Sequence, residues 1–207
     1  MSVKSFASLF FSLICLFAWC DDVAPGKAAR SGKSKQTAAA VKAAQKAKKQ
    51  KLQKISITNL KIIGTAVMRF ATDNRERLPK SLKELVTRSY LTDCKCYISP
   101  FDKKSVIGSA KDFDPVKNCS YAYLGMGVIA GNYGSEVPLV FEKPWCLPKN
   151  SNSIAVMMAD GSARIVEIPN VNKKSCKEVV EFILKGVKLG SARKLILKNA
   201  RAADLSR

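Results

Sequence analysis

Histidine is absent from this chain of 207 residues, and acidic side chains are scarce: 16 Asp and Glu face 36 Lys and Arg, for a formal net charge of +20. Histidine is the side chain that most often acts as a general base near neutral pH, and it is a common zinc ligand. Its absence argues against the hydrolases and zinc enzymes that depend on histidine. No other group of residues in the sequence has the pattern of a catalytic site. The sequence therefore predicts a protein that is not an enzyme and has no cofactor.

A long apolar run is also missing. Residues 5–19 are apolar, but 15 residues of helix are too short for a hydrocarbon core about 30 Å thick. A basic start before this run and Asp21 after it are typical of a signal peptide, with Ala18 and Cys20 as the small residues before the cut. Lipidation of Cys20 is an alternative, although Trp19 is bulkier than a lipobox residue. An uncleaved anchor is another. We expect export to the periplasm, the cell surface or the medium.

Residues 27–54 contain ten basic residues and neither acidic nor aromatic ones. Because Ala, Lys and Gln favour helices, this segment predicts a basic helix. It can be interpreted as an arm that binds nucleic acid or another polyanion, such as anionic lipid or polysaccharide. The lysines that would bind are Lys42, Lys46, Lys48, Lys49 and Lys51. A solvated stalk is the simpler interpretation, because no aromatic side chain is present to stack on bases.

The helix then acquires an apolar stripe, with Leu60, Ile63, Val67 and Phe70 spaced three, four and three residues apart. This spacing puts one helical face into a core. The helix should end near residues 73–74, because the proline at position 79 disfavours helical geometry in the residue before it.

Further along, Ser81 and Glu84 have the spacing of a capping box and predict a helix over 81–91, followed by a long loop over 92–118. Four strands are then expected, two of them joined by a tight Asp160-Gly161 turn. Their ranges are 119–124, 137–142, 154–159 and 163–168. Helices first and an antiparallel meander afterwards indicate an α+β fold. Tyr121 and Tyr123 could form a stacking face for a ligand, but core packing is the commoner role of such residues.

Two more helices are predicted near the end of the chain. Ser175 and Glu178 form a second capping box, and Val179, Phe182 and Ile183 share the apolar face of the helix that follows. Residues 191–203 predict a basic amphipathic helix that either docks on the body or touches an anionic membrane surface.

Five cysteines follow the apolar segment: Cys94, Cys96, Cys119, Cys146 and Cys176. Export to an oxidising compartment favours disulfides among them, with one thiol left free or pairing between molecules. Cys94 and Cys96 are too close along the chain to pair with each other. Burial as small apolar side chains is the alternative. A four-thiolate zinc site has the wrong spacing, and a reactive free thiol lacks a histidine base.

Several short motifs follow one another in a familiar order between residues 39 and 168. Asn-Leu-Lys-x-Ile-Gly at 59–64 is followed by Asp-Asn, Leu-Pro, Pro-Phe-Asp and an Asp-Gly turn. The motif residues are Asn59, Leu60, Lys61, Gly64, Asp73, Asn74, Pro79, Pro100, Asp102, Asp160 and Gly161. This order resembles bacterial prepilin-like proteins and type II secretion pseudopilins, in the variant with a histidine, nine residues and then Asp-Gly.

The sequence departs from that family at two points. Asn150 stands where the family has its histidine, and the Gly-Phe-Thr-Leu-Ile-Glu start of pilins has no counterpart. The resemblance implies a pilin-like head in which a long helix packs on a small antiparallel sheet, without fibre assembly of the usual kind. Some relatives bind calcium in C-terminal loops, but Asp160 is explained by its turn alone, so no metal is expected.

We accordingly expect a signal segment at 1–20, a basic linker and helix stalk at 21–54, a pilin-like α+β body at 55–168 and a basic helical extension at 169–207. We expect a structural protein or an interaction module that works outside the cytoplasm, with or without a membrane anchor. Its partners would be protein subunits of an envelope or secretion assembly, or an anionic surface.

Overall fold

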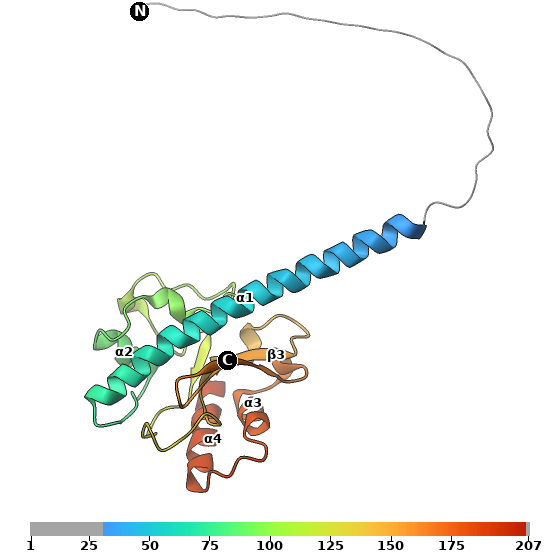
Figure 1. Ribbon diagram of the computed structural model, residues 1–207. Coiled ribbons are helices and arrows are strands. Elements are labelled where there is room, and N and C mark those ends of the chain that lie inside the picture. The colour runs from blue at the N-terminus through green and yellow to red at the C-terminus, as the bar shows by residue number, and fades with distance from the viewer. Residues whose placement is uncertain (1–30, 206–207) are drawn as a thin grey trace, which may run out of the picture. The chain divides into compact units, whose positions relative to one another are not determined.

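The computed structural model describes the backbone of residues 31–205 and the side chains of residues 39–205 (Figure 1). The predicted signal segment and Cys20 lie outside these residues. The chain divides into two compact units, Met1–Lys42 and Ala43–Arg207. All elements that follow the first helix belong to the second unit, including residues 169–205.

The first helix, α1, spans Ser31–Asp73 and ends where the sequence predicts. Its stripe residues Leu60, Ile63, Val67 and Phe70 are at most 3% exposed, which confirms that this half of α1 enters the core. The side-chain amide of Asn74 donates to the carbonyl oxygen of Phe70 at 2.7 Å and so caps the last turn.

Four antiparallel strands form one sheet in the order β1-β2-β3-β4. Their bounds are Tyr121–Tyr123 for β1, Pro138–Glu142 for β2, Ser153–Met158 for β3 and Ala163–Glu167 for β4. All four lie within the predicted strand ranges to within one residue, and the α+β class is confirmed. In the β3–β4 turn only Gly161 takes a positive φ, at 81°, and Asp160 accepts hydrogen bonds from Ser162.

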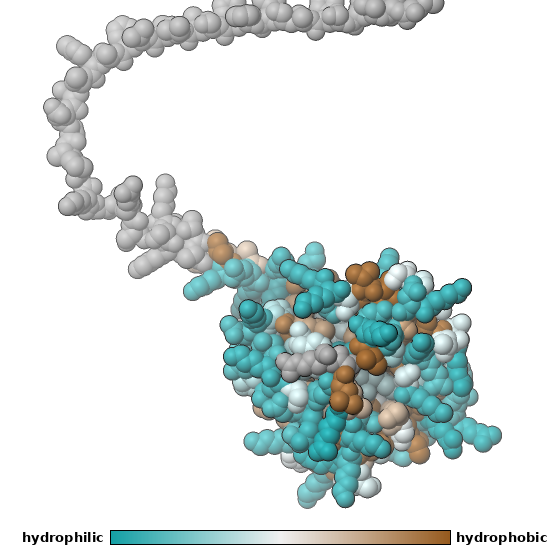
Figure 2. Space-filling view, turned by 180° about the vertical axis from the view of Figure 1, so that it is seen from behind, coloured by the Kyte–Doolittle hydropathy of each residue, from teal (hydrophilic) through white to brown (hydrophobic). Residues whose placement is uncertain are grey.

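Helices cover both faces of the sheet (Figure 1). Helix α1 crosses one face, while α3, Cys176–Ile183, and α4, Ser191–Asp204, pack together on the other side. Every residue of β2 is buried, as is all of β3 except its first residue, because side chains of both faces meet a helix. Figure 2 shows the molecule from behind, where polar side chains surround scattered apolar ones.

One buried carboxylate ties α1 to the sheet. Glu142, at the end of β2, is 1% exposed. Its Oε1 accepts hydrogen bonds from the hydroxyls of Ser56 on α1 and Ser99, both at 2.6 Å, and its Oε2 accepts from the backbone N–H of Ala155 on β3 at 3.1 Å. Burial raises the pKa of Glu142, and these three donors oppose that rise.

The predicted long loop is held by packing and contains short 3₁₀ turns. These turns are η1, Cys94–Tyr97, and η2, Ala110–Asp112; two more, η3 and η4, follow at Pro144–Cys146 and Val171–Lys173. The rings of Tyr97 and Phe113 stack with their centroids 4.3 Å apart, and both residues are buried. Tyr121 is buried and Tyr123 is partly buried against the core, so the expected core packing of both residues is confirmed, and both also line a cavity beside β1.

Three local predictions need correction. Helix α2 spans only Leu82–Thr87, and Ser81 precedes it without a side-chain capping bond, because the Glu84 carboxylate accepts from the N–H of Lys80 instead. Phe182 of α3 is 43% exposed, and Val180 is buried in its place. The capping box of Ser175 and Glu178 is confirmed.

Candidate interaction groove

A groove of about 870 Å³ lies where α1 ends. Three segments line it: the end of α1 with the turn that follows, α2 with the residues on either side of it, and the loop after β1. Its lining residues are Phe70, Asp73, Asn74, Arg75, Arg77, Leu78, Lys80, Glu84, Arg88, Met126, Gly127, Val128 and Ile129. Four of them are basic and two are acidic, so the groove combines an apolar floor with a net positive charge.

The turn after α1 has an unusual backbone. Arg75 and Glu76 both take left-handed conformations, with φ of 55° and 61°. The N–H of Glu76 donates to the carbonyl oxygen of Ala71 at 2.8 Å, which is the helix-ending bond of a Schellman motif, and glycine is the usual residue at the position of Arg75. Two backbone bonds, Leu78 N–H to Val128 O and Ala130 N–H to Glu76 O, hold this turn against the loop after β1.

Replacing Arg75 by glycine is expected to raise the free energy of unfolding by about 1 kcal/mol, because glycine adopts a left-handed φ without the steric cost that other residues carry. Such a gain corresponds to a rise in melting temperature of roughly 2–4 °C for a domain of this size. Calorimetry measures it. The control is Arg77→Gly, at a position without a positive φ, where added backbone entropy should lower stability. A lower melting temperature for Arg75→Gly would contradict a steric cost of the left-handed backbone at Arg75.

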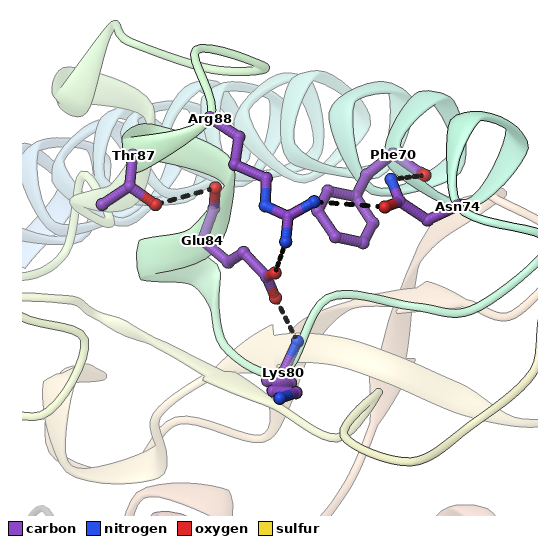
Figure 3. Close-up of polar contacts among 6 residues, drawn as sticks. All are labelled: Phe70, Asn74, Lys80, Glu84, Thr87 and Arg88. Carbon is purple, nitrogen blue, oxygen red and sulfur yellow. Dashed lines mark hydrogen bonds and ion pairs between the residues drawn. The ribbon is translucent and has the colours of Figure 1, made fainter.

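Arg88 closes one wall of the groove (Figure 3). Its guanidinium forms an ion pair with Glu84 at 3.0 Å, donates to the Oδ1 atom of Asn74 at 3.2 Å and lies 5.3 Å from the ring centroid of Phe70. Glu84 also accepts from the N–H of Lys80 at 2.8 Å. Arg88 therefore joins α2 to the end of α1, and its charge is partly balanced by Glu84.

The remaining cations of the groove are open to a partner. Arg75, Arg77 and Lys80 are exposed, and none of them forms an ion pair with the residues that the structure describes. Beside them Met126 and Ile129 expose 42% and 44% of their surface. Guanidinium groups next to apolar side chains suit an acidic segment with apolar residues.

Tyr90 donates to the carboxylate of Asp73 at 2.9 Å, and this hydrogen bond raises the pKa of Tyr90.

The lysines of the predicted polyanion arm lie along α1. Lys42, Lys46, Lys48, Lys49 and Lys51 are exposed, and within residues 39–205 none of them forms an ion pair. None of them lines the groove.

Most motif residues hold the body together. Asn59 donates to the carbonyl oxygen of Ile98 at 3.1 Å, and Leu60 is fully buried. The carbonyl oxygen of Pro79 accepts from the hydroxyl of Tyr123 at 2.7 Å. Lys61 is exposed. These contacts connect α1 and the segment after it to the loop and to β1.

Asp102, the last residue of the Pro-Phe-Asp motif, is a second centre of hydrogen bonds. It accepts from the hydroxyls of Ser105 and Ser120 at 2.7 and 2.8 Å and from two backbone N–H groups of its own loop. Burial alone would raise the pKa of Asp102, but these donors outweigh it and lower the pKa to about 2. The residue in the histidine position, Asn150, takes a left-handed φ of 60°.

All five cysteines between residues 31 and 205 are free thiols in the structure. Burial raises the pKa of Cys96 and Cys146 to about 12 and that of Cys119 to about 11, and it also raises the pKa of Cys94 and Cys176. A thiol with a raised pKa has little thiolate, which is the nucleophilic form. Disulfide pairing among these cysteines stays a prediction.

Sequence reasoning did not find the groove, since its walls come from segments that are distant along the chain.

In the part of the chain that the structure describes, no three His, Cys, Asp or Glu side chains gather as a metal ion would need. The described helices include none that is long and apolar enough to cross a bilayer. No family model, curated protein or solved structure matches the chain.

Proposed function

We propose that this chain is a non-catalytic structural or interaction module that works outside the cytoplasm and has a head of the pilin and pseudopilin type. The observation that supports this proposal is the course of α1. One helix changes from an exposed lysine-rich stretch to a buried apolar stripe, which packs across an antiparallel meander of four strands. The order of the motif residues in the sequence supports the same proposal.

Protein subunits of an envelope or secretion assembly are the partners that suit the groove. Arg75, Arg77 and Lys80 would contact acidic side chains of a neighbouring subunit, while Met126 and Ile129 would contact its apolar ones. Charge-assisted hydrogen bonds from arginine to carboxylates give such contacts their specificity.

The first experiment is to express the full-length gene in its native cell, fractionate the cell, and determine the mass and the N-terminus of the mature protein. We expect a product outside the cytoplasm that begins at Asp21, or at a lipidated Cys20. An intact Met1 in the cytoplasm would overturn the export on which the proposed function depends.

In the same cells, Arg77→Glu with Lys80→Glu tests the groove by chemical cross-linking. The double variant should lose cross-linked species larger than the monomer, because like charges repel an acidic partner. The matched control is Lys111→Glu with Lys117→Glu, which reverses two exposed charges that do not line the groove. Equal cross-linking by both double variants would argue against the groove as the interface.

Polyanion binding is the second candidate function, and the exposed lysines of α1 are the observation in its favour. A lysine-rich helical stretch without acidic residues, such as residues 31–54 of α1, would bind phosphates or sulfates through counterion release, so its affinity would fall steeply with salt. The fractionation separates the two functions, because a chain retained in the cytoplasm favours this candidate.

A further inference from the structure

A second cavity, which shares Lys80 and Met126 with the groove, lies between β1, the start of α2 and α4. It has a volume of about 300 Å³, at the lower end of the range for small-molecule sites. Much of its wall is apolar and includes Leu82, Val116, Ala122 and Met126. Two polar side chains in this wall, Asn199 and Lys143, are each only 3% exposed. Their hydrogen bonds indicate what the cavity binds.

Asn199 presents an acceptor that has no donor. Its Nδ2 atom donates to the carbonyl oxygens of Leu124 and Met126 at 2.7 and 2.8 Å, and this pair of bonds fixes the orientation of the amide. Exchanging the two amide atoms would set the oxygen against two carbonyl oxygens. The Oδ1 atom is buried and finds no partner among the described residues. Since leaving a buried acceptor without a donor is unfavourable, this atom calls for a donor from outside the chain.

Lys143 presents a buried cation without a counterion. Its ammonium donates to the carbonyl oxygens of Pro115 and Val116 at 3.1 and 3.4 Å and lies 5.9 Å from the ring centroid of Trp145, and none of these contacts supplies a full negative charge. No Asp or Glu oxygen in residues 39–205 lies within ion-pair distance of it. Buried charges in proteins are normally paired, because desolvation without a partner is unfavourable.

We propose that this cavity is a binding site for a small apolar carboxylate that carries one hydrogen-bond donor. The carboxylate would pair with Lys143, the donor would satisfy Oδ1 of Asn199, and the apolar body would lie against Leu82, Val116 and Met126. A neutral or cationic molecule would leave the lysine unpaired, and a molecule without a donor would leave the amide oxygen unsatisfied. This inference is independent of the proposed function.

N-acetyl-L-leucine is a probe with all three features, and two analogues remove them one at a time. N-acetyl-L-leucinamide has lost the charge, and N-acetyl-N-methyl-L-leucine has lost the N–H donor. Titration of the full chain, followed by calorimetry, should show saturable binding of the first probe and at least tenfold weaker binding of each analogue, since a site built for polar groups rejects ligands that leave them unpaired. Equal affinity for the acid and the amide would overturn the proposal.

Two variants and one control connect that binding to the cavity. Ala202 lines the cavity and is exposed, so Ala202→Phe should block the entrance without disturbing the core and weaken N-acetyl-L-leucine binding at least tenfold. Arg201→Phe adds the same ring at the neighbouring exposed position outside the cavity and should change nothing. Lys143→Met should weaken binding of the acid at least tenfold and leave the amide unaffected, a difference that loss of stability alone would not produce. Absence of saturable binding, or full binding by Ala202→Phe, would contradict the site.

Discussion

Replacing Glu142 by alanine is expected to lower the free energy of unfolding by about 3–5 kcal/mol. The carboxylate is 1% exposed and accepts hydrogen bonds from Ser56, Ser99 and the N–H of Ala155. Alanine would leave all three donors buried without an acceptor and would open a cavity between α1, the loop and the sheet. Urea denaturation followed by circular dichroism measures the loss.

Glutamine at position 142 separates the hydrogen bonds from the charge. Its oxygen can accept from Ala155, and its NH₂ group can donate to Ser56 and Ser99, because serine hydroxyls rotate and also accept. Glu142→Gln should therefore keep most of the stability that alanine removes. A loss as large as that of Glu142→Ala would show that the charge itself stabilises the fold.

The pH dependence of the same pair gives a second measurement. Burial raises the pKa of Glu142 in the folded state above its ordinary value of 4.5. Stability linked to a raised pKa is fully present below the unfolded-state value and is lost as the pH rises through the folded-state value. The glutamine variant has no such loss, so its stability relative to the native chain should increase from pH 4 to pH 8. A difference that stays constant over this range would contradict the raised pKa.

Local patterns in the sequence were sufficient for most of the secondary structure. The apolar stripe from Leu60 to Phe70 predicted the buried face of α1, because helix periodicity is local. The Asp160-Gly161 turn predicted the β3–β4 hairpin in the same way.

Predictions failed where tertiary contacts choose between local options. Glu84 had the spacing of a capping box with Ser81, but Lys80 and Arg88 take its carboxylate. In the short helix α3 the sequence did not distinguish Phe182 from Val180, since α4 decides which face is covered. No sequence pattern indicated that Glu142 is buried, because its hydrogen-bond donors lie 13, 43 and 86 residues away along the chain.

The groove and the apolar cavity could not be predicted from the sequence for the same reason. Arg75 and Val128 line the groove from distant segments, and Lys143 and Asn199 line the cavity from others. The residues of each pair are too far apart along the chain to belong to one sequence motif. What the sequence predicted about the groove was limited to the end of α1 near Asn74.

Gly64→Leu is expected to lower the free energy of unfolding by about 2 kcal/mol, as the balance of two effects. Gly64 lies in α1 against the sheet, and a Cβ atom there would lie 2.5 Å from the Sδ atom of Met157 on β3. Met157 is fully buried, so its side chain has little room to move, and overpacking of this kind costs about 1–3 kcal/mol or more. Replacing a helical glycine returns only about 1 kcal/mol.

The partner residue makes this prediction specific. In the double variant Gly64→Leu with Met157→Ala, the leucine can occupy the space that the methionine leaves, so the two losses should combine to at least 1 kcal/mol less than their sum. Thr65→Leu, one residue along on the exposed face of α1, is the control and should change stability by less than about 0.5 kcal/mol. If the two losses simply add, the close approach of α1 to β3 at Gly64 does not explain the glycine.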